Sequence, residues 1–464
     1  MVVDSCFEDI FDLLSSTTNL TLPKYKPQCL DLEFHNEKGS LYFFQGTEAV
    51  YAGKPPILPF AASDVVYSKI NNWRCLVKEQ EGFKAVYELT LDIEGSNIVY
   101  EPGDTIGVIP HNSETDVEQL LSLLDLPNSD NAYSISADKG TKIPLHIPVK
   151  STLRHVLKHC VDLRSIVKKL YLLELSQHTS EEREKKALQY LCSTEGSAIY
   201  TQHVLNRKLT FTQILAKFKS CKPPIGVILA HSSRLLPRPY SIVNCIKNNE
   251  NFIKICFSVN TNKGLTTGWL ESLISNDLEI AMKKLSLNND GKIPIYLRKN
   301  CGFLLPRNGE KCLLIGPGTG VAPFIGFLQE NLHNKTNYPN FKIGDIWLYN
   351  GCRNPDIDFL YKKELEGFLS NKILTKLRTA FSRVENGGIK HVQDAILQDA
   401  AEIVGFIQNG GLVYICGDYV SMATQVRAAL VKCFMVEEQI SQKEAECIIT
   451  QMEKDKKYNV DIWS

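Results

Sequence analysis

The sequence lacks an excess of charge of either sign. Among its 464 residues, Lys and Arg together number 52, and Asp and Glu together also number 52. A chain without net charge has no overall field to draw it to nucleic acid or to an anionic membrane surface. We therefore expect no nucleic-acid partner, and local patches must recognise any partner that binds.

The sequence also lacks paired cysteines and a leader. Its 14 cysteines are scattered without a CxxC pair, so no disulfide framework is indicated. The first residues, MVVDSCFEDIFDLL, carry acids where a signal peptide needs basic residues and an apolar run. The most apolar window, 311–328, contains glycines and prolines that suit a strand, a loop and a helix better than a membrane span. We predict a cytoplasmic protein without a membrane anchor in this chain.

A metal site is not indicated either. His155 and His159 are four residues apart on a predicted helix, a spacing that brings both to one face. No third ligand is near in the sequence, and a zinc site needs at least three protein ligands. We therefore predict no metal.

The hydrophobic pattern predicts several domains, as the length alone does. Alternating apolar and polar residues indicate antiparallel strands, and apolar residues three and four apart indicate helices. Strands that alternate with helices along the chain indicate a parallel sheet. The predicted parts are an N-terminal segment and linker (1–61), a β-barrel (62–112 and 236–293), an all-helical insertion in it (113–235) and an α/β domain (294–464).

Three glycines follow an apolar segment near residue 315. Gly316, Gly318 and Gly320 come after KCLLI and before a predicted helix that starts near Ala322. Backbone N–H groups in such a turn, with a helix N-terminus, can bind a pyrophosphate. The spacing differs from GxGxxG, so an ordinary tight turn is the alternative interpretation.

A polar and basic cluster follows the predicted strand LRTAF. It contains Ser382 and Arg383, with Lys390 and Gln393 a few residues later. A hydroxyl, a guanidinium and an ammonium suit the 2′-phosphate that distinguishes NADPH from NADH. Two charge-assisted hydrogen bonds of about 1.5–3 kcal/mol each would favour NADPH by about a hundredfold or more. A solvated basic loop is the alternative.

Two further segments could hold a flavin. Arg238, Tyr240 and Ser241 lie in RPYS at the start of a predicted strand, and residues 264–267 open a predicted helix. An aromatic face, a guanidinium and a helix N-terminus fit an isoalloxazine ring and its pyrophosphate. Tyr240 as a core residue and Thr267 as a helix N-cap are the structural alternatives.

The chain ends with an acid and an aromatic residue, Asp461 and Trp463. Termini usually fray in polar residues. The ending therefore predicts a packed C-terminus, which acts either as a functional lid or as a docked hydrophobic plug.

Taken in order, these segments resemble the motif series of the diflavin reductases. The series is YEPGD, RPYS, GLTTGWL, GPGTGVAPFIGFL, NGCR, FSR with KHVQ, YICGD and DIWS, and it covers residues from about 60 to 464. The similarity is to the part of each diflavin reductase that resembles ferredoxin–NADP reductase. It implies a β-barrel FAD domain over 62–293 and a parallel-sheet NADP(H) domain over 294–464.

The resemblance also implies a role for each matching residue. FAD would contact Arg238, Tyr240, Ser241, Gly264, Leu265, Thr266 and Thr267, and Trp463 would cover its ring. NADP would contact Gly318 and Thr319 at its pyrophosphate, Cys416, Asp418 and Asp461 on the nicotinamide side, and Arg298, Ser382, Arg383, Lys390 and Gln393 at the 2′-phosphate end.

The implied catalytic set is Ser241, Cys416, Asp461 and Trp463. Hydride transfer needs the reacting atoms within about 3–3.5 Å of each other, so a removable aromatic lid can gate turnover. The hydroxyl would bind the flavin nitrogen, the thiol would lie beside the nicotinamide, and the carboxylate would stabilise positive charge on the oxidised ring.

Within the family, the segments LYLLELSQHTSEEREKKALQYLCS and SCKPPIGVILAH look most like the branch that reactivates methionine synthase, a cobalamin enzyme. This implies an NADPH-dependent reductase with methionine synthase as its partner. A haemoprotein or diaphorase-type reductase is the alternative in the same chemistry, and an inactive binding partner of a cobalamin enzyme is the alternative from another class. The first 60 residues are too few for the family's FMN domain, so FMN is expected only from a separate or missing domain.

Overall fold

The structure is a computed structural model that divides into two compact units. It describes residues 19–38, 49–126, 130–137, 141–248, 251–274, 291–299, 302–306, 309–384, 388–418 and 422–463. The first unit comprises Met1–Leu58 and Pro110–Leu236, and the second comprises Pro59–Ile109 and Pro237–Ser464. The β-barrel and α/β segments therefore belong to one unit, and the helical insertion belongs to the other.

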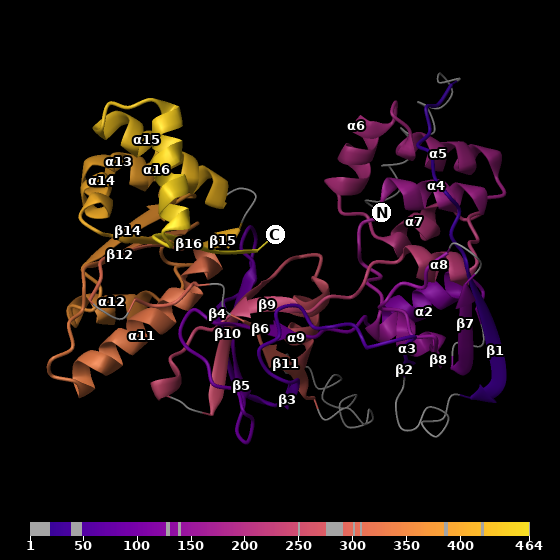
Figure 1. Ribbon diagram of the computed structural model, residues 1–464, viewed down its shortest axis with the longest axis horizontal. Coiled ribbons are helices and arrows are strands. Elements are labelled where there is room, and N and C mark those ends of the chain that lie inside the picture. The colour runs from indigo at the N-terminus through magenta and orange to yellow at the C-terminus, as the bar shows by residue number, and fades with distance from the viewer. Residues whose placement is uncertain are drawn as a thin grey trace. The chain divides into compact units, whose positions relative to one another are not determined.

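Two antiparallel sheets form the first part of the second unit (Figure 1). One has the order β10-β5-β4 and the other β3-β11-β6-β9. Their strands are β3 (Val66–Ser68), β4 (Ile70–Val77), β5 (Ala85–Asp92), β6 (Thr105–Val108), β9 (Arg238–Ser241), β10 (Phe252–Val259) and β11 (Ile293–Leu297). Inward side chains of both sheets, such as Leu89, Ile106 and Ile255, are fully buried in one core. The alternation in the sequence thus predicted the antiparallel architecture correctly.

A five-stranded parallel sheet forms the rest of this unit, in the order β14-β13-β12-β15-β16. Its strands are β12 (Cys312–Ile315), β13 (Ile346–Cys352), β14 (Lys376–Phe381), β15 (Leu412–Asp418) and β16 (Tyr458–Trp463). All the strands predicted in this region are present, and neighbouring strands pair in parallel.

Helices cover both faces of the parallel sheet (Figure 1). Leu313 and Ile315 belong to one hydrophobic core and Leu314 to another, because successive side chains of a strand point to opposite faces. The helices are α11 (Ala322–Asn337), α12 (Lys362–Ser370), α13 (Val392–Gln398), α14 (Ala400–Gln408), α15 (Thr424–Glu437) and α16 (Gln442–Lys454). The prediction of an α/β domain is confirmed.

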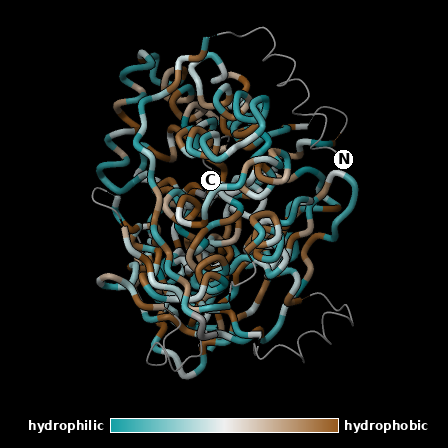
Figure 2. Tube along the Cα trace, turned by 90° about the vertical axis from the view of Figure 1, so that its right-hand side faces the viewer, coloured by the Kyte–Doolittle hydropathy of each residue, from teal (hydrophilic) through white to brown (hydrophobic). Residues whose placement is uncertain are grey.

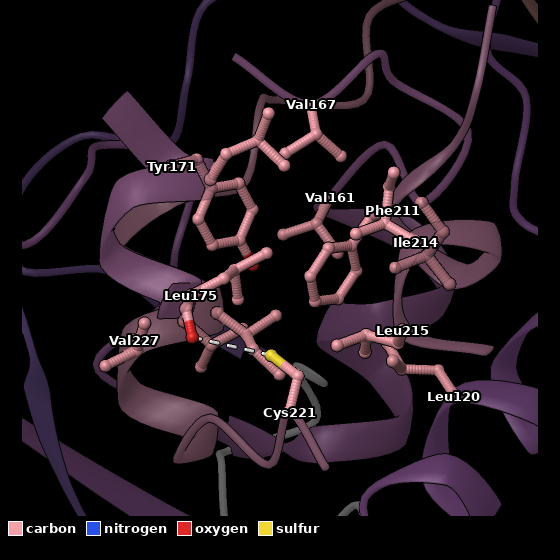
Figure 3. Packing of buried hydrophobic residues seen from close by; sticks show 14 of the residues in the cluster. Leu120, Val161, Val167, Tyr171, Leu175, Phe211, Ile214, Leu215, Cys221 and Val227 are labelled. Atoms are coloured by element: carbon pink, nitrogen blue, oxygen red, sulfur yellow. Dashed lines mark hydrogen bonds between the residues drawn. The ribbon is translucent and has the colours of Figure 1, made fainter. Parts of the chain in front are cut away.

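Helices dominate the first unit, and their apolar faces meet in one core (Figure 3). They are α2 (Glu114–Leu123), α3 (Leu153–His159), α4 (Lys169–Gln177), α5 (Glu182–Cys192), α6 (Ser197–Tyr200), α7 (Phe211–Lys217) and α8 (Ile225–His231), with the π-helix η2 (Thr201–Leu205). Within this core the Cys221 thiol donates to the Leu175 carbonyl over 3.6 Å.

The expectation of an all-helical insertion needs one correction. A four-stranded sheet, β1-β7-β8-β2, lies in the first unit. Its strands are β1 (Leu30–Lys38), β2 (Ala49–Val50), β7 (Asn131–Ala137) and β8 (Lys150–Thr152). β1 and β2 come from the predicted linker, where nearby prolines and glycines mask the strand pattern. β1 pairs with β7 and β2 pairs with β8, in each case with a segment about a hundred residues later in the chain, so no local signal reveals either pairing.

Hydrophobic and hydrophilic residues alternate along the trace of the chain (Figure 2). Among the described residues, no helix combines the length and the apolar composition that crossing a bilayer requires. The apolar window at 311–328 becomes β12, the 3₁₀ turn η4 (Gly318–Val321) and the start of α11. The rings of His155 and His159 lie 5.0 Å apart, but no cluster of three or more metal-ligating side chains occurs in the described part of the chain.

Candidate active site

Three polar side chains meet where the antiparallel and parallel sheets of the second unit approach each other. Ser241 ends β9, and Cys416 and Asp461 are register partners on β15 and β16. The Ser241 hydroxyl donates to Asp461 Oδ2 over 2.6 Å, and Cys416 Sγ lies 4.0 Å from the same oxygen. The structure thus brings together three of the four side chains predicted to be catalytic, from three strands that are far apart in the sequence.

Burial sets the protonation of this cluster. It raises the pKa of Asp461, although the hydrogen bond from Ser241 and the positive charge of Arg298 act in the opposite direction. Burial, together with the neighbouring Asp461 carboxylate, also raises the pKa of the Cys416 thiol well above its ordinary value. Cys416 is completely buried, so it is a neutral thiol and no thiolate nucleophile.

A glycine allows the turn after β12 to approach β15 closely. A Cβ atom on Gly320 would lie 2.1 Å from the carbonyl oxygen of Cys416, and that oxygen is fixed by the sheet. Gly318 has a φ of 57°, and a Cβ there would meet nothing within 4 Å. Gly320 is therefore needed for a close approach of two backbone segments, and Gly318 for a left-handed turn. The close approach places η4 beside the catalytic cluster.

Gly320→Ala should destabilise the α/β domain by about 1–3 kcal/mol, because the methyl group must push two fixed backbone segments apart. Gly405→Ala is the matched control, since Gly405 lies within α14 and a Cβ there would meet nothing within 4 Å. Chemical denaturation of both variants measures the difference. Equal stability of the two variants would contradict the close approach.

A cavity of about 550 Å³ lies at the carboxyl ends of the parallel strands. Parallel α/β sheets bind ligands at this edge. Residues from the loops after β12, β13 and β14 and from the first turns of α13 and α15 line the cavity, together with residues of β5 and β10. Five residues predicted to bind NADP line it: Gly318, Thr319, Ser382, Lys390 and Gln393.

Two cations at this cavity were not predicted from the sequence. Lys84, just before β5, and Arg353, just after β13, both line it. With Lys390 they make three cationic side chains in the lining, which also contains one acid, Asp358. The excess of positive charge fits the phosphates of a dinucleotide. The NGCR segment carried the signal for Arg353, but Lys84 has no local motif that could have revealed it.

Two residues predicted at the 2′-phosphate end of NADP do not line the cavity. Arg383 donates to the carbonyl oxygen of Gly82 over 2.9 Å, and its guanidinium lies 5.4 Å from the centre of the Phe83 ring. Arg298 lies over the ring of Phe60, 5.3 Å from its centre, and its charge acts on Asp461. The contact predicted between Arg298 and the 2′-phosphate stays a prediction.

Apart from Trp463, the residues predicted to bind FAD belong to the antiparallel sheets and to the start of the helix that follows β10. β9 carries Arg238 and Tyr240 and pairs with β6, and the Tyr240 ring meets Phe257 edge-on at 6.4 Å. Gly264 precedes α9 (Leu265–Ile274), whose first turn contains Leu265, Thr266 and Thr267.

One atom in this turn supports a ligand. Thr266 is 4% exposed, and its hydroxyl has no hydrogen-bond partner in the described residues. A buried hydroxyl without a partner is costly, and a helix N-terminus provides N–H donors for a phosphate. The donors present therefore fit a flavin pyrophosphate.

Two predicted side chains lie outside the described residues. Trp463 and Asp418 are register partners at the ends of β16 and β15, but only their strand positions are described. The roles predicted for Trp463 as a lid and for Asp418 on the nicotinamide side stay predictions.

Comparison with known proteins identifies two domain families. Residues 58–271 match the FAD binding domain family, and residues 314–428 match the oxidoreductase NAD-binding domain family. The chain therefore has an FAD-binding domain and an NAD(P)-binding domain. These ranges include the insertion, most of the parallel sheet and every strand of the two antiparallel sheets except β11.

Individual relatives extend the match over almost the whole chain. Methionine synthase reductases of Bos taurus and Homo sapiens are each 32% identical over 477 aligned positions, which cover 97% of this chain and 66% of the relative. The NADPH–cytochrome P450 reductase of Musca domestica is 34% identical over 421 positions, which cover 88% of this chain and 59% of the relative. The chain thus spans about two thirds or less of the length of these relatives.

Proposed function

The chain belongs to the diflavin reductase family, of which it carries the FAD- and NAD(P)-binding module, and we propose that it transfers hydride from NADPH to FAD and passes the electrons on. The observation that carries the proposal is the hydrogen bond between Ser241 and Asp461, with Cys416 beside it. This cluster and a cation-lined cavity for a dinucleotide both lie at the carboxyl ends of the parallel strands.

The cofactors, when bound, supply the redox chemistry, and the chain supplies position and charge. Asp461 places a carboxylate where positive charge develops on the substrate side, and its burial strengthens that interaction. The Ser241 hydroxyl donates to Asp461 and keeps acceptor positions for a second hydrogen bond. Cys416 fills the remaining space with a neutral thiol that excludes water.

The cavity accounts for the choice of NADPH. Ser382 and Lys390 line it, with Arg353 and Lys84 near them. These groups offer a hydroxyl, two ammonium groups and a guanidinium, which together can bind a phosphate dianion. A terminal ribose without that phosphate would not make these charge-assisted contacts, so NADH should bind more weakly.

The pH dependence of hydride transfer should report Asp461. Its pKa is raised, so the carboxylate gains its proton, and the activity falls, at a higher pH than for an ordinary aspartate. Because the charge of Arg298 lowers this pKa, Arg298→Gln should move the acid limb of the single-turnover rate to still higher pH. Stopped-flow measurement at saturating NADPH tests this.

A remote arginine provides the control for this shift. Arg378 lies on β14, pairs with Asp399 between α13 and α14, and does not line the cavity. Arg378→Gln should leave the acid limb unchanged. An unmoved acid limb in Arg298→Gln would exclude Asp461 as the group that the pH profile reports.

Methionine synthase is the electron acceptor that we propose. Support comes from methionine synthase reductases, which align with 97% of the chain. An added FMN domain is part of this proposal. The test is a reconstitution in which the purified chain, FAD, NADPH and a separate FMN domain restore turnover to inactivated methionine synthase. Failure with an FMN domain that does accept electrons from the chain would reject this acceptor.

A haemoprotein acceptor is the second candidate. It is favoured by the cytochrome P450 reductase of Musca domestica, which has the higher identity, 34%, over a shorter alignment. Reduction of a microsomal cytochrome by the same reconstituted system, without reactivation of methionine synthase, would support it. An inactive binding partner of a cobalamin enzyme is the remaining alternative, and a purified chain that binds such an enzyme but no flavin would favour it.

A further inference from the structure

A tight turn joins β4 to β5 beside the nucleotide cavity. Gln80 and Phe83 exchange both backbone hydrogen bonds across this turn, over 3.3 and 2.9 Å. Gly82 is the third residue of the turn and has a φ of 77°, which is the left-handed conformation that glycine adopts most easily. Lys84, two residues later, lines the cavity. The carbonyl oxygen of Gly82 takes no part in the hydrogen bonds that close the turn.

Two guanidinium groups converge on this carbonyl oxygen. Arg353 donates to it from Nη1 over 2.6 Å, and Arg383 donates to it from Nη1 over 2.9 Å. The backbone N–H of Arg383 also donates to the Arg353 carbonyl over 2.9 Å, because both residues follow the ends of the paired strands β13 and β14. One oxygen of Gly82 therefore holds two cationic side chains next to each other.

The charge of these two arginines is not balanced by an acid. In the residues that the structure describes, neither guanidinium forms an ion pair. The nearby carboxylate of Asp358 accepts from the backbone N–H of Arg353, over 3.0 Å. Neighbouring like charges repel each other, and the carbonyl of Gly82 brings no net charge to offset this. An anion that binds against both guanidinium groups would relieve the repulsion.

The β4–β5 hairpin is fixed firmly enough to act as a support. Arg74 of β4 forms ion pairs with Glu88 of β5, over 3.1 Å, and with Glu364 of α12, over 2.8 Å. Val77 and Val86 of the same two strands are buried in one core with side chains of α11 and α12. The Gly82 carbonyl therefore belongs to a hairpin that packs on the α/β domain, and a binding site gains most from side chains that such a support holds in place.

We propose that Gly82 is a positioning residue of the NADP(H) site, because its carbonyl holds Arg353 and Arg383 ready for the 2′-phosphate. A guanidinium has five N–H donors, and each contact with Gly82 uses Nη1 alone, so donors remain for the phosphate. An arginine loses side-chain freedom when it binds a phosphate, and a fixed acceptor removes part of that cost before the nucleotide arrives. The inference rests on the proposed use of NADPH, since NADH has no 2′-phosphate.

A methyl group on Gly82 tests this role. A Cβ atom there would overlap Nη1 of Arg383, which is the end of a flexible side chain and can move aside while the fold is kept. Gly95→Ala is the matched control, because Gly95 has a similar φ of 74° and a Cβ there would meet nothing within 4 Å. Both variants therefore carry the same kind of backbone strain, but only Gly82→Ala displaces a guanidinium.

Calorimetry on the FAD-loaded chain with NADP⁺ and with NAD⁺ measures the effect. We expect Gly82→Ala to bind NADP⁺ about tenfold more weakly, the size that one lost charge-assisted contact gives, and to bind NAD⁺ with unchanged affinity. Gly95→Ala should bind both nucleotides as the unmodified chain does. In steady-state kinetics the change should lie in KM for NADPH and not in kcat. Equal weakening of NADP⁺ and NAD⁺ binding would indicate a general loosening and overturn the proposal.

A double variant shows whether Gly82 acts through Arg383. Gly82→Ala should add no further loss of NADP⁺ affinity to Arg383→Gln, because no guanidinium is left for the methyl group to displace. Losses that add up would contradict this route.

The same measurements separate this inference from the proposed function. An unmodified chain that binds NADP⁺ no more tightly than NAD⁺ would reject the use of NADPH, and the role of Gly82 with it. A chain that prefers NADP⁺ and keeps its full preference in Gly82→Ala would reject the positioning role alone. Circular dichroism checks that each variant is folded.

Discussion

Asp461→Asn will slow hydride transfer from NADPH to bound FAD by about 10²–10³-fold, with both cofactors still bound. The carboxylate is the buried acceptor of the Ser241 hydrogen bond and provides the negative charge of the cluster. Removing one preorganised electrostatic group from an active site typically has an effect of this size. Single-turnover reduction of the flavin by excess NADPH measures it.

The stability of the same variant separates catalysis from unfolding. Burial raises the pKa of Asp461 in the folded chain. The stability that protonated Asp461 contributes is therefore fully present below the pKa that the group has in the unfolded chain. It is lost as pH rises through the pKa that the group has in the folded chain. At neutral pH the charged form destabilises the fold, so Asp461→Asn should raise the melting temperature while it lowers the rate.

An exposed acid close in the sequence serves as the control. Asp455 ends α16 on the surface, where it accepts a hydrogen bond from Gln451. Asp455→Asn should change neither the hydride-transfer rate nor the melting temperature appreciably. A slow Asp461→Asn variant that is also less stable would indicate a packing role and would contradict the electrostatic one.

Replacing Ser382 and Lys390 together by alanine should reduce the preference for NADPH over NADH by about a hundredfold or more. Both residues line the cavity at the carboxyl ends of the parallel strands. Each charge-assisted hydrogen bond to a phosphate contributes about 1.5–3 kcal/mol, so the loss of two gives at least this ratio. The ratio of kcat/KM for the two nucleotides measures it, and most of the change should lie in KM for NADPH.

The matched control removes the same groups elsewhere in the domain. Ser370 and Lys363 lie on α12, and neither lines the cavity. Their double alanine variant should retain the full preference for NADPH. If the Ser382 and Lys390 variant retains it as well, the 2′-phosphate is bound by other residues.

The sequence alone predicted the elements whose signals are local. Each strand from β12 to β16 is an apolar segment bounded by turn residues, and one such segment leads into the turn that contains Gly318 and Gly320. The site residues Ser241, Cys416 and Asp461 were identified through resemblance to a family. No spacing in the sequence shows that their side chains meet, since β9 lies more than 150 residues before β15.

What the sequence could not predict depends on tertiary contacts. Lys84 reaches the nucleotide cavity only because the antiparallel and parallel sheets face each other there. The direction of Arg383 depends on the carbonyl of Gly82, about 300 residues earlier in the chain. The small sheet of the helical unit joins β1 to β7, which are about a hundred residues apart in the chain. The sequence shows which residues are charged, but it does not show which distant residues they contact in the folded chain.

Anaerobic mixing of the FAD-loaded chain with NADPH tests the central claim most directly. The account predicts one FAD per chain and a fast loss of the oxidised-flavin absorbance, slowed several-fold when the transferred hydrogen is replaced by deuterium. A chain that binds FAD but is not reduced by NADPH, or a reduction without an isotope effect in a single turnover limited by chemistry, would contradict it.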